Sequence, residues 1–385
     1  MKKKIIIFTS SGGNGHISAT KALQSYLSDE YEIKPVYIFE EVFKGIEPVA
    51  TITFGKITGE DVYNFFLRRR YYKVLNFIYD FGKWYFGLRS KSMLKLIRAY
   101  LLVEKPDLII SVIPVVNDII LVTAQDQNIP FLLIPTDFDV TSFITGIYQP
   151  TYDKFALTLG SNDPRVMRTA HTSHINPEQI ISAGLPMRKD FFEPKDIESL
   201  KKKFSVTEGK PVIVIMMGGQ GNTSILAYAQ QLATLPIAAH IIFCIGRNSD
   251  IAATIKDIHF APYITITVIG FTERISDLLA MADLLITKSG SVSFAEGITM
   301  NVPMILDATA TLLYWERLNH ILLTTHNWGV CLKKVGDLNT AILAILGDRV
   351  KYQHMKQNIA AFTTHRLDQE IKLIIQKLLI QQTIG

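Results

Sequence analysis

One pattern recurs in this chain: an apolar run of strand length, a turn of glycine or serine, and a segment with apolar residues at helical spacing. It begins near residue 5, again near residue 212 and again near residue 283. A strand that passes through a tight turn into a helix is the repeating unit of doubly wound α/β domains with parallel sheets. The segment at 212 restarts the architecture of 5–27, and 385 residues exceed one ordinary core, so the sequence predicts two such domains.

The domain boundaries follow from where the apolar runs stop. In the first half we expect six or seven strands, with candidates at residues 5–9, 33–39, 107–113, 129–135, 153–158 and 179–182. In the second half we expect strands at residues 212–217, 239–245, 264–269, 283–287, 302–306 and 329–332. Residues 185–188 and Pro194 are typical of a linker, and 350–380 has a helical pattern. The predicted domains are 1–185 and 186–365, with a C-terminal helix at 366–385 expected to pack back on the N-terminal domain.

The turn after the apolar run 283–286 has the composition of an anion site. It is built from Lys288, Gly290 and small hydroxyl residues, which leave backbone N–H groups uncovered. A helix that starts there directs free N–H groups and its positive dipole end into the crevice beyond the sheet. Glu296, about one turn into that helix, suits a ribose diol better than a phosphate. Small residues that merely let a helix pack closely are the alternative.

A second glycine loop, residues 10–16, follows the first predicted strand. It lacks the Gly-Lys-Ser/Thr ending of a P-loop and the third glycine of a dinucleotide fingerprint. Its notable residue is His16 at the helix start, where an imidazole can accept a proton near neutral pH. Asp137 and Asp139 follow the strand at 129–135 and so lie at the crevice edge. A surface histidine and turn-capping aspartates are the alternatives.

Residues 60–103 are rich in basic and aromatic side chains and poor in acidic ones. Such a surface suits anionic lipid headgroups, with about 1 kcal/mol from each basic residue near the membrane. Nucleic acid is the competing interpretation, but no RNA- or DNA-binding module surrounds the segment, and we expect no nucleic-acid partner. Helices with aromatic residues inward and solvated Lys and Arg are the third. The expected membrane or acceptor residues are Tyr63, Phe66, Arg68, Arg69, Arg70, Tyr71, Trp84 and Arg89.

Several classes of site are not expected. Cys244 and Cys331 lie in apolar runs and have no Cys or His at metal-ligand spacing, so we expect buried thiols and no metal site. The second half has no Asp-x-Asp clamp, so a departing diphosphate would be stabilised by backbone N–H groups, without a metal or other cofactor. No stretch is apolar for the roughly 20 residues of a membrane span. We therefore expect a cytoplasmic protein, peripheral on the cytosolic face of a membrane.

Taken in order, several motifs resemble glycosyltransferase family 28 along nearly the whole chain. Within it the sequence is most similar to monogalactosyldiacylglycerol synthases and processive diacylglycerol glucosyltransferases, and more distantly to the peptidoglycan N-acetylglucosaminyltransferase. The matching segments are 11–19, 59–64, 106–111, 136–137, 184–186, 218–221 and 286–290. The His-bearing glycine loop together with the Thr-Lys-x-Gly turn is the specific part of the resemblance.

The resemblance implies a GT-B fold, with two Rossmann-like doubly wound domains facing a cleft, and an inverting transfer that needs no enzyme-bound metal. It also implies a UDP-sugar on the C-terminal domain and a lipid acceptor, usually diacylglycerol. His16 would be the base or acceptor-orienting group, and Asp137 its companion. The implied donor-binding residues are Gly15, Gly218, Gly219, Gln220, Gly221, Asn222, Phe271, Thr287, Lys288, Ser289, Gly290, Ser291, Glu296, Glu316 and Asn319.

The chain departs from the family in its sugar-reading run, which is Gly-Gln-Glu-x-x-x-Asn in relatives. Here residues 314–319 keep Glu316 and Asn319 but lack the Gly-Gln pair. Three functions are therefore compatible with the sequence. The first is a UDP-sugar-dependent transfer to a lipid at the membrane surface. The second is an enzyme of the same fold, either a transferase to a soluble or protein acceptor or a sugar-nucleotide epimerase. The third is a non-catalytic nucleotide-sugar-binding protein.

Overall fold

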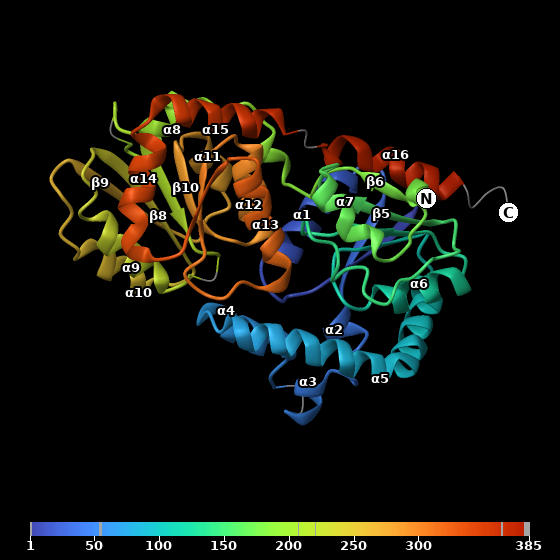
Figure 1. The fold of residues 1–385 in the computed structure, drawn as a ribbon. Helices are drawn as coiled ribbons and strands as arrows, with labels where there is room; N and C mark the ends of the chain where they lie inside the picture. Colours follow the sequence, from blue (N-terminus) through green and yellow to red (C-terminus); the bar gives the residue numbers. More distant parts are fainter. Residues whose placement is uncertain (1, 54–55, 207, 220, 363–364, 381–385) are drawn as a thin grey trace. The chain divides into compact units, whose positions relative to one another are not determined.

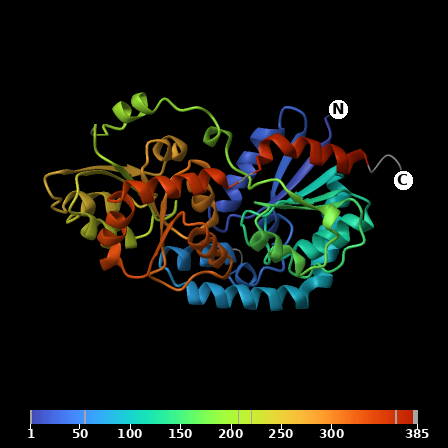
Figure 2. The same cartoon turned by 45° about the horizontal axis from the view of Figure 1, so that its top comes forward.

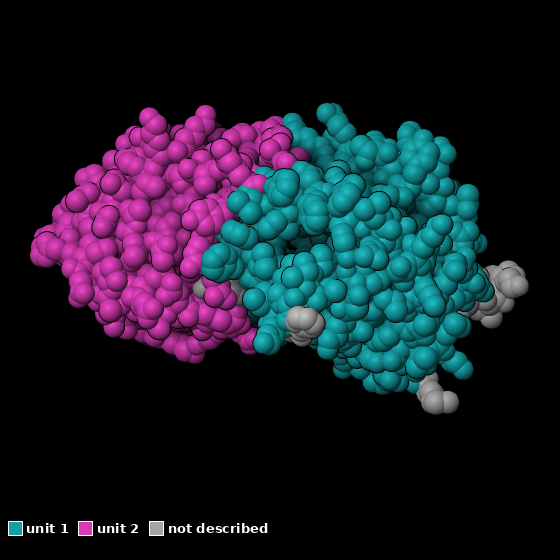
Figure 3. All heavy atoms as spheres, turned by 90° about the horizontal axis from the view of Figure 1, so that it is seen from below, with its two compact units in different colours: residues 1–67, 74–189, 363–385 teal, residues 68–73, 190–362 magenta. Residues whose placement is uncertain are grey.

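Two six-stranded parallel sheets with flanking helices make up the fold (Figures 1 and 2). The computed structural model describes residues 2–53, 56–206, 208–219, 221–362 and 365–380. The chain divides into two units, coloured separately in Figure 3. Unit 1 comprises residues 1–67, 74–189 and 363–385, and unit 2 comprises residues 68–73 and 190–362.

The sheet of unit 1 has the strand order β2-β1-β3-β4-β5-β6. Its strands are β1 (Lys4–Thr9), β2 (Glu32–Tyr37), β3 (Leu108–Ser111), β4 (Phe131–Leu133), β5 (Phe155–Leu159) and β6 (Ile180–Ser182). The four residues of β1 from Ile5 to Phe8 are all fully buried. Because successive side chains of a strand point to opposite faces, this continuous burial means that both faces of the sheet are covered.

The helices of unit 1 begin with α1, which follows the first glycine loop. They are α1 (Gly15–Leu27), α2 (Ile38–Glu41), α3 (Pro48–Ile52), α4 (Gly59–Arg68), α5 (Tyr72–Glu104), α6 (Asn117–Asp126), α7 (Pro164–His171) and α16 (Leu367–Ile380). Short 3₁₀ turns lie at Pro177–Gln179 and, where the chain passes from unit 1 into unit 2, at Lys189–Phe191. The segment 68–73, which joins α4 to α5, is grouped with unit 2.

Helix α16 returns to unit 1 and lies beside α1 (Figures 1 and 2). Its buried Ile371 and Ile375 share a core cluster with Leu23 of α1 and Ile7 of β1. Gly184 lies against the backbone just before α16. Its φ is +86°, and a Cβ at this position would lie 2.0 Å from the carbonyl oxygen of His365. Only glycine therefore permits this approach of two backbones.

The sheet of unit 2 has the order β12-β11-β10-β7-β8-β9. Its strands are β7 (Val212–Met216), β8 (Ala239–Gly246), β9 (Ile264–Gly270), β10 (Leu284–Lys288), β11 (Met304–Asp307) and β12 (Gly329–Leu332). Its helices are α8 (Ile197–Lys203), α9 (Ser224–Leu232), α10 (Asp250–Lys256), α11 (Ile275–Ala280), α12 (Ser291–Thr299), α13 (Arg317–Thr325), α14 (Leu338–Leu346) and α15 (Arg349–Ala361). Short 3₁₀ turns at Tyr314–Glu316 and Val335–Asp337 precede α13 and α14.

The predicted fold class is confirmed, and every predicted strand is present within a few residues. The helical pattern predicted at 350–380 comprises two helices, α15 in unit 2 and α16 in unit 1, and α16 lies within the C-terminal helix expected at 366–385. No helix in the part of the chain that the structure describes is both long and apolar enough to span a bilayer.

Candidate functional site

The glycine loop after β7 needs glycine for steric reasons. Gly218 and Gly221 have φ of +95° and +76°. A Cβ on Gly221 would lie 2.5 Å from the carbonyl oxygen of Ile245 at the end of β8, and the N–H of Arg247 donates to Gly219 O at 3.2 Å. The loop is therefore pressed against the end of the neighbouring strand. Asn222 accepts from Ser224 N at 2.9 Å, while the predicted donor residue Gln220 lies outside the described residues.

The turn after β10 uses its hydroxyl groups internally. Thr287 Oγ1 donates to Met216 O at 2.8 Å, and Ser289 Oγ donates to Asp307 O at 3.0 Å. Ser291 Oγ accepts from Asn319 Nδ2 at 3.1 Å. The three hydroxyl residues are buried and hydrogen-bonded within the protein, so they hold the turn in place. The N-cap of α12 is Gly290, and no side chain of the described residues caps this helix, which leaves its first N–H groups for an anion.

A lysine lies over the two glycine turns. If Gly218 and Gly290 carried a Cβ, those atoms would lie 3.3 Å and 3.0 Å from Lys288 Cε. Lys288 Nζ is 3.8 Å from Oε1 of Glu316, whose side chain is 5% exposed. Burial raises the pKa of the Glu316 carboxyl, and the ammonium of Lys288 opposes this rise. The structure therefore brings together four predicted donor residues from three separate segments.

Asn319 ties α13 to the same turn. It is fully buried, and its Nδ2 donates to Ser289 O at 2.8 Å as well as to Ser291 Oγ. Its Oδ1 has no hydrogen-bond partner among the described residues. Glu296 of α12 is also buried, at 8% exposure.

Phe271 borders a pocket at the ends of β8 and β9. The pocket has a volume of about 460 Å³ and is lined by Ile245, Gly246, Arg247, Ser249, Ala252, Lys256, Val268, Gly270 and Phe271. The guanidinium of Arg247 lies 4.1 Å from the centre of the Phe271 ring. An aromatic face next to two cations suits a planar base that carries an anionic group. The predicted donor residues Gly218, Lys288 and Phe271 thus lie at the ends of β7, β10 and β9, and Arg247 follows β8; these four strands are consecutive in the sheet.

Sequence reasoning missed Asp307 at the end of β11. Its Oδ1 accepts from Thr309 N at 2.8 Å, and its backbone oxygen accepts from Ser289. Its Oδ2 accepts from Arg70 Nη2 at 2.6 Å, and the side chain of Arg70 is 19% exposed. Arg70 was expected at a membrane surface, but within unit 2 it pairs with a buried carboxylate instead. His320, whose Nε2 hydrogen-bonds Ser289 Oγ, was missed as well.

In unit 1, His16 is the second residue of α1, after Gly15. Its Nδ1 lies 2.8 Å from Val112 O, and since a carbonyl only accepts, Nδ1 carries the proton and Nε2 keeps a lone pair. Burial lowers the pKa of His16 to about 4, partly offset by this hydrogen bond. The imidazole is therefore neutral at physiological pH, with a fixed tautomer and an unprotonated Nε2.

Two side chains of α4 hold the glycine loop that carries His16. Asn64 Oδ1 accepts from Gly13 N at 3.0 Å, and its Nδ2 donates to Ser11 O at 3.2 Å. Glu60 Oε1 accepts from Ser11 N at 3.1 Å, and its carboxylate accepts from the hydroxyls of Ser10 and Ser11. Segment 59–64 was noted in the sequence only as part of the resemblance. No pattern there indicated that it contacts a loop about 50 residues away.

Asp137 lies beyond β4, and β3 separates β4 from β1 in the sheet. Its Oδ2 accepts from Thr136 Oγ1 at 3.3 Å. Asp139 Oδ1 accepts from Thr141 N at 3.0 Å, the turn-capping bond expected as the alternative for this residue. Of the other predicted membrane residues, Tyr63 and Phe66 are partly buried. Arg68, Arg69, Tyr71, Trp84 and Arg89 are exposed.

Solved structures with the same architecture define the class. Acinetobacter baumannii MurG has a TM-score of 0.62 at 12% identity and covers 98% of this chain and 100% of that chain. The glycosyltransferase SnogD from Streptomyces nogalater has a TM-score of 0.63 at 13% identity, with the same coverage. The chain has the GT-B fold.

Residues 212–307 match the glycosyltransferase family 28 C-terminal domain. A processive diacylglycerol beta-glucosyltransferase from Bacillus licheniformis is 23% identical over 361 residues, which are 93% of this chain and 90% of that protein. The resemblance predicted from the sequence is confirmed. This chain is a glycosyltransferase, and the match to the family 28 C-terminal domain lies within its second unit.

Proposed function

We propose that the protein transfers a hexose from a UDP-sugar to a diacylglycerol-like lipid at the cytosolic surface of a membrane, with inversion and without a metal. The observation that carries the proposal is the convergence of Gly218, Lys288 and Gly290 at the ends of the adjacent strands β7 and β10. Relatives named processive diacylglycerol beta-glucosyltransferase align with most of this chain, and this supports a lipid acceptor.

In this proposal unit 2 holds the donor. The uracil base takes the pocket beside Phe271 and Arg247. The diphosphate is bound by the free N–H groups at the start of α12 and by the ammonium of Lys288. Glu296 binds the ribose. Charge on the leaving diphosphate grows in the transition state, and these fixed donors stabilise it without reorganisation.

Unit 1 supplies the base. His16 Nε2 accepts the proton of the acceptor hydroxyl while that oxygen attacks the anomeric carbon of the sugar. The bond from this carbon to the diphosphate oxygen breaks with its electron pair, UDP leaves, and a single displacement inverts the anomeric centre. The hydrogen bond from Nδ1–H to Val112 O keeps the ring oriented for this step.

The experiment is a donor and acceptor screen with the full chain. UDP-glucose, UDP-galactose and UDP-N-acetylglucosamine are each incubated with diacylglycerol dispersed in a neutral detergent, and UDP release and glycolipid mass are measured. UDP release with formation of a β-linked glycolipid from an α-linked donor is expected. Consumption of a UDP-sugar without an acceptor, release only with a soluble acceptor, or no release by folded protein would each overturn the proposal.

A further inference from the structure

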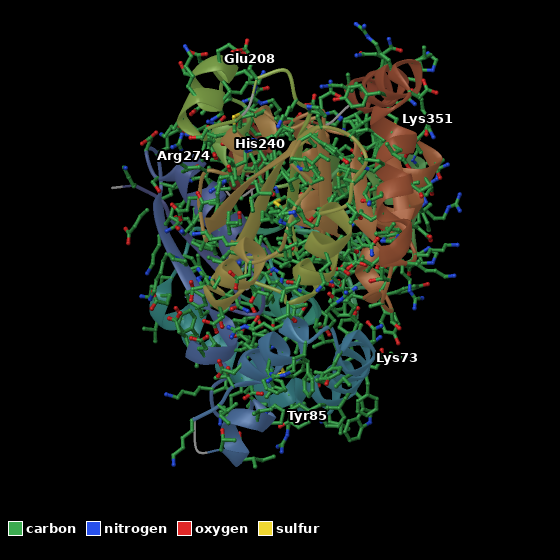
Figure 4. The ribbon with its side chains drawn as sticks, turned by 90° about the vertical axis from the view of Figure 1, so that its left-hand side faces the viewer. Lys73, Tyr85, Glu208, His240, Arg274 and Lys351 are labelled. Carbon is green, nitrogen blue, oxygen red and sulfur yellow. The ribbon has the colours of Figure 1, made fainter. Side chains whose placement is uncertain are left out.

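Helix α5 has one buried and one exposed face. Leu75, Met93, Ile97 and Leu101 are at most 1% exposed. Midway along the helix, the hydroxyl of Tyr85 donates to Ile46 O at 2.7 Å (Figure 4 labels Tyr85). These contacts fix which side of α5 faces away from unit 1.

The exposed face begins with an apolar ridge formed by Phe77, Phe81, Trp84 and Leu88. The four residues are spaced by four, three and four positions, which places them on one side of a helix. Phe77 is 70% exposed, Trp84 60% and Leu88 66%. The ring centres of Phe81 and Trp84 are 5.5 Å apart. A continuous exposed strip of this kind marks a binding surface, whereas single exposed apolar residues do not.

The same spacing continues into a basic groove. Alternating steps of three and four positions lead from Leu88 to Lys91, Lys95, Arg98 and Leu102. A groove of about 430 Å³ is lined by Lys91, Leu94, Lys95, Arg98, Ala99 and Leu102. Arg98 pairs with Asp126, but Lys91 and Lys95 have no ion-pair partner among the residues that the structure describes. Two unpaired ammonium groups thus border an apolar floor.

We propose that this face of α5 is the docking surface for an anionic phospholipid bilayer. The apolar ridge enters the boundary between headgroups and acyl chains, and Lys91 and Lys95 bind a lipid phosphate in the basic groove. The inference deepens the proposed function and rests on its lipid acceptor. The sequence predicted a dispersed set of membrane residues, and this inference confines the membrane contact to one face of α5. Arg70 is not part of that face, because it pairs with Asp307.

Charge and shape together favour a bilayer over another partner. A phospholipid has an anionic headgroup joined to hydrocarbon, and the helix face offers cations next to aliphatic and aromatic side chains in the same order. Nucleic acid would use the cations and rings but gains little from the exposed Leu88 and Leu102.

The charge term is tested by vesicle sedimentation of the full chain without donor. Vesicles of phosphatidylcholine alone are compared with vesicles in which one lipid in three is phosphatidylglycerol. Wild type should bind the anionic vesicles and be released by salt. The double variant Lys91→Gln/Lys95→Gln should bind about 25-fold more weakly, at about fivefold for each charge. The control Lys351→Gln/Lys377→Gln removes the same charge from exposed positions on α15 and α16 and should change binding less than about twofold.

The apolar term is tested by Leu88→Ser and by Trp84→Ser. Each should weaken vesicle binding about tenfold, because the side chain no longer leaves water. Leu373→Ser, which removes a 56% exposed leucine from α16, is the matched control and should have no effect. Circular dichroism of each variant shows that it is folded.

Equal weakening by the α5 variants and their controls would overturn the inference, as would binding that ignores lipid charge. Binding of duplex DNA or RNA with the same variant dependence, and none to vesicles, would overturn it too. The two proposals fail separately. Sugar transfer to detergent-dispersed diacylglycerol without vesicle binding would refute the docking surface and leave the transferase proposal intact. Vesicle binding that depends on the α5 residues, without transfer to any acceptor, would support the docking surface and refute the transferase proposal.

Discussion

The state of His16 gives a prediction about the pH dependence of transfer. Lowering its pKa from 6.5 to about 4 disfavours the imidazolium by roughly 3.4 kcal/mol, at about 1.36 kcal/mol for each pKa unit. A general base works when deprotonated, so kcat/KM should be flat above the pKa of the free enzyme and fall tenfold per pH unit below it. At pH 5 about 90% of the base should remain active, whereas a histidine of ordinary pKa would retain about 3%.

The assay is kcat/KM for UDP release between pH 5 and 8 with lipid acceptor in neutral detergent. His16→Gln should lower kcat by about 10²- to 10⁴-fold and leave the affinity for UDP within about twofold, because the base does not contact the nucleotide in the proposed mechanism. His171→Gln is the matched control, since His171 is an exposed histidine of the same unit. It should leave both quantities unchanged.

Two results would refute this reasoning. An acidic limb near pH 6.5 in the wild type, lost in His16→Gln, would show that the imidazole is solvated and that its tautomer is not fixed by Val112. If His16→Gln had the wild-type kcat at every pH, His16 would take no part in the chemistry.

Four further predictions concern the loops and the ion requirement. Asn319→Ala removes two hydrogen bonds to the β10 turn and should weaken UDP binding about tenfold by calorimetry, while Asn339→Ala on α14 should not change it. Asn64→Ala releases the His16 loop and should lower kcat at least tenfold with unchanged UDP affinity; equal loss of both would contradict this role. Gly184→Ala should destabilise the protein by about 2–4 kcal/mol in urea unfolding, because its Cβ meets His365 O. Transfer should be unaffected by EDTA, and loss of activity restored by a divalent ion would refute the metal-independent mechanism.

The sequence predicted the strands well because parallel strands buried on both faces are continuous apolar runs, as Ile5–Phe8 shows. It also predicted that Lys288 and Gly290 follow a strand, and the structure places them beside the turn at Gly218. Side-chain direction was not predictable. Ser289 and Ser291 could have faced a ligand or the interior, and only the positions of Asp307 and Asn319 decide that they turn inward.

Long-range partners were the other limit. Glu60 and Asn64 hold a loop about 50 residues earlier in the chain, and Arg70 reaches a carboxylate 237 positions away. Hydrophobic periodicity reports which face of an element is buried, and it carries no information about which polar group it meets.

The return of α16 to unit 1 has a consequence for biosynthesis. The buried residues of α16, Ile371 and Ile375 among them, complete an apolar cluster whose other members lie before residue 184, so a ribosome makes residues 190–362 of unit 2 between the two parts of that cluster. During this interval unit 1 exposes the apolar surface that α16 later covers, while unit 2 can fold as soon as its own strands emerge. Nascent chains stalled before residue 367 should therefore recruit chaperones at their first half and not at their second.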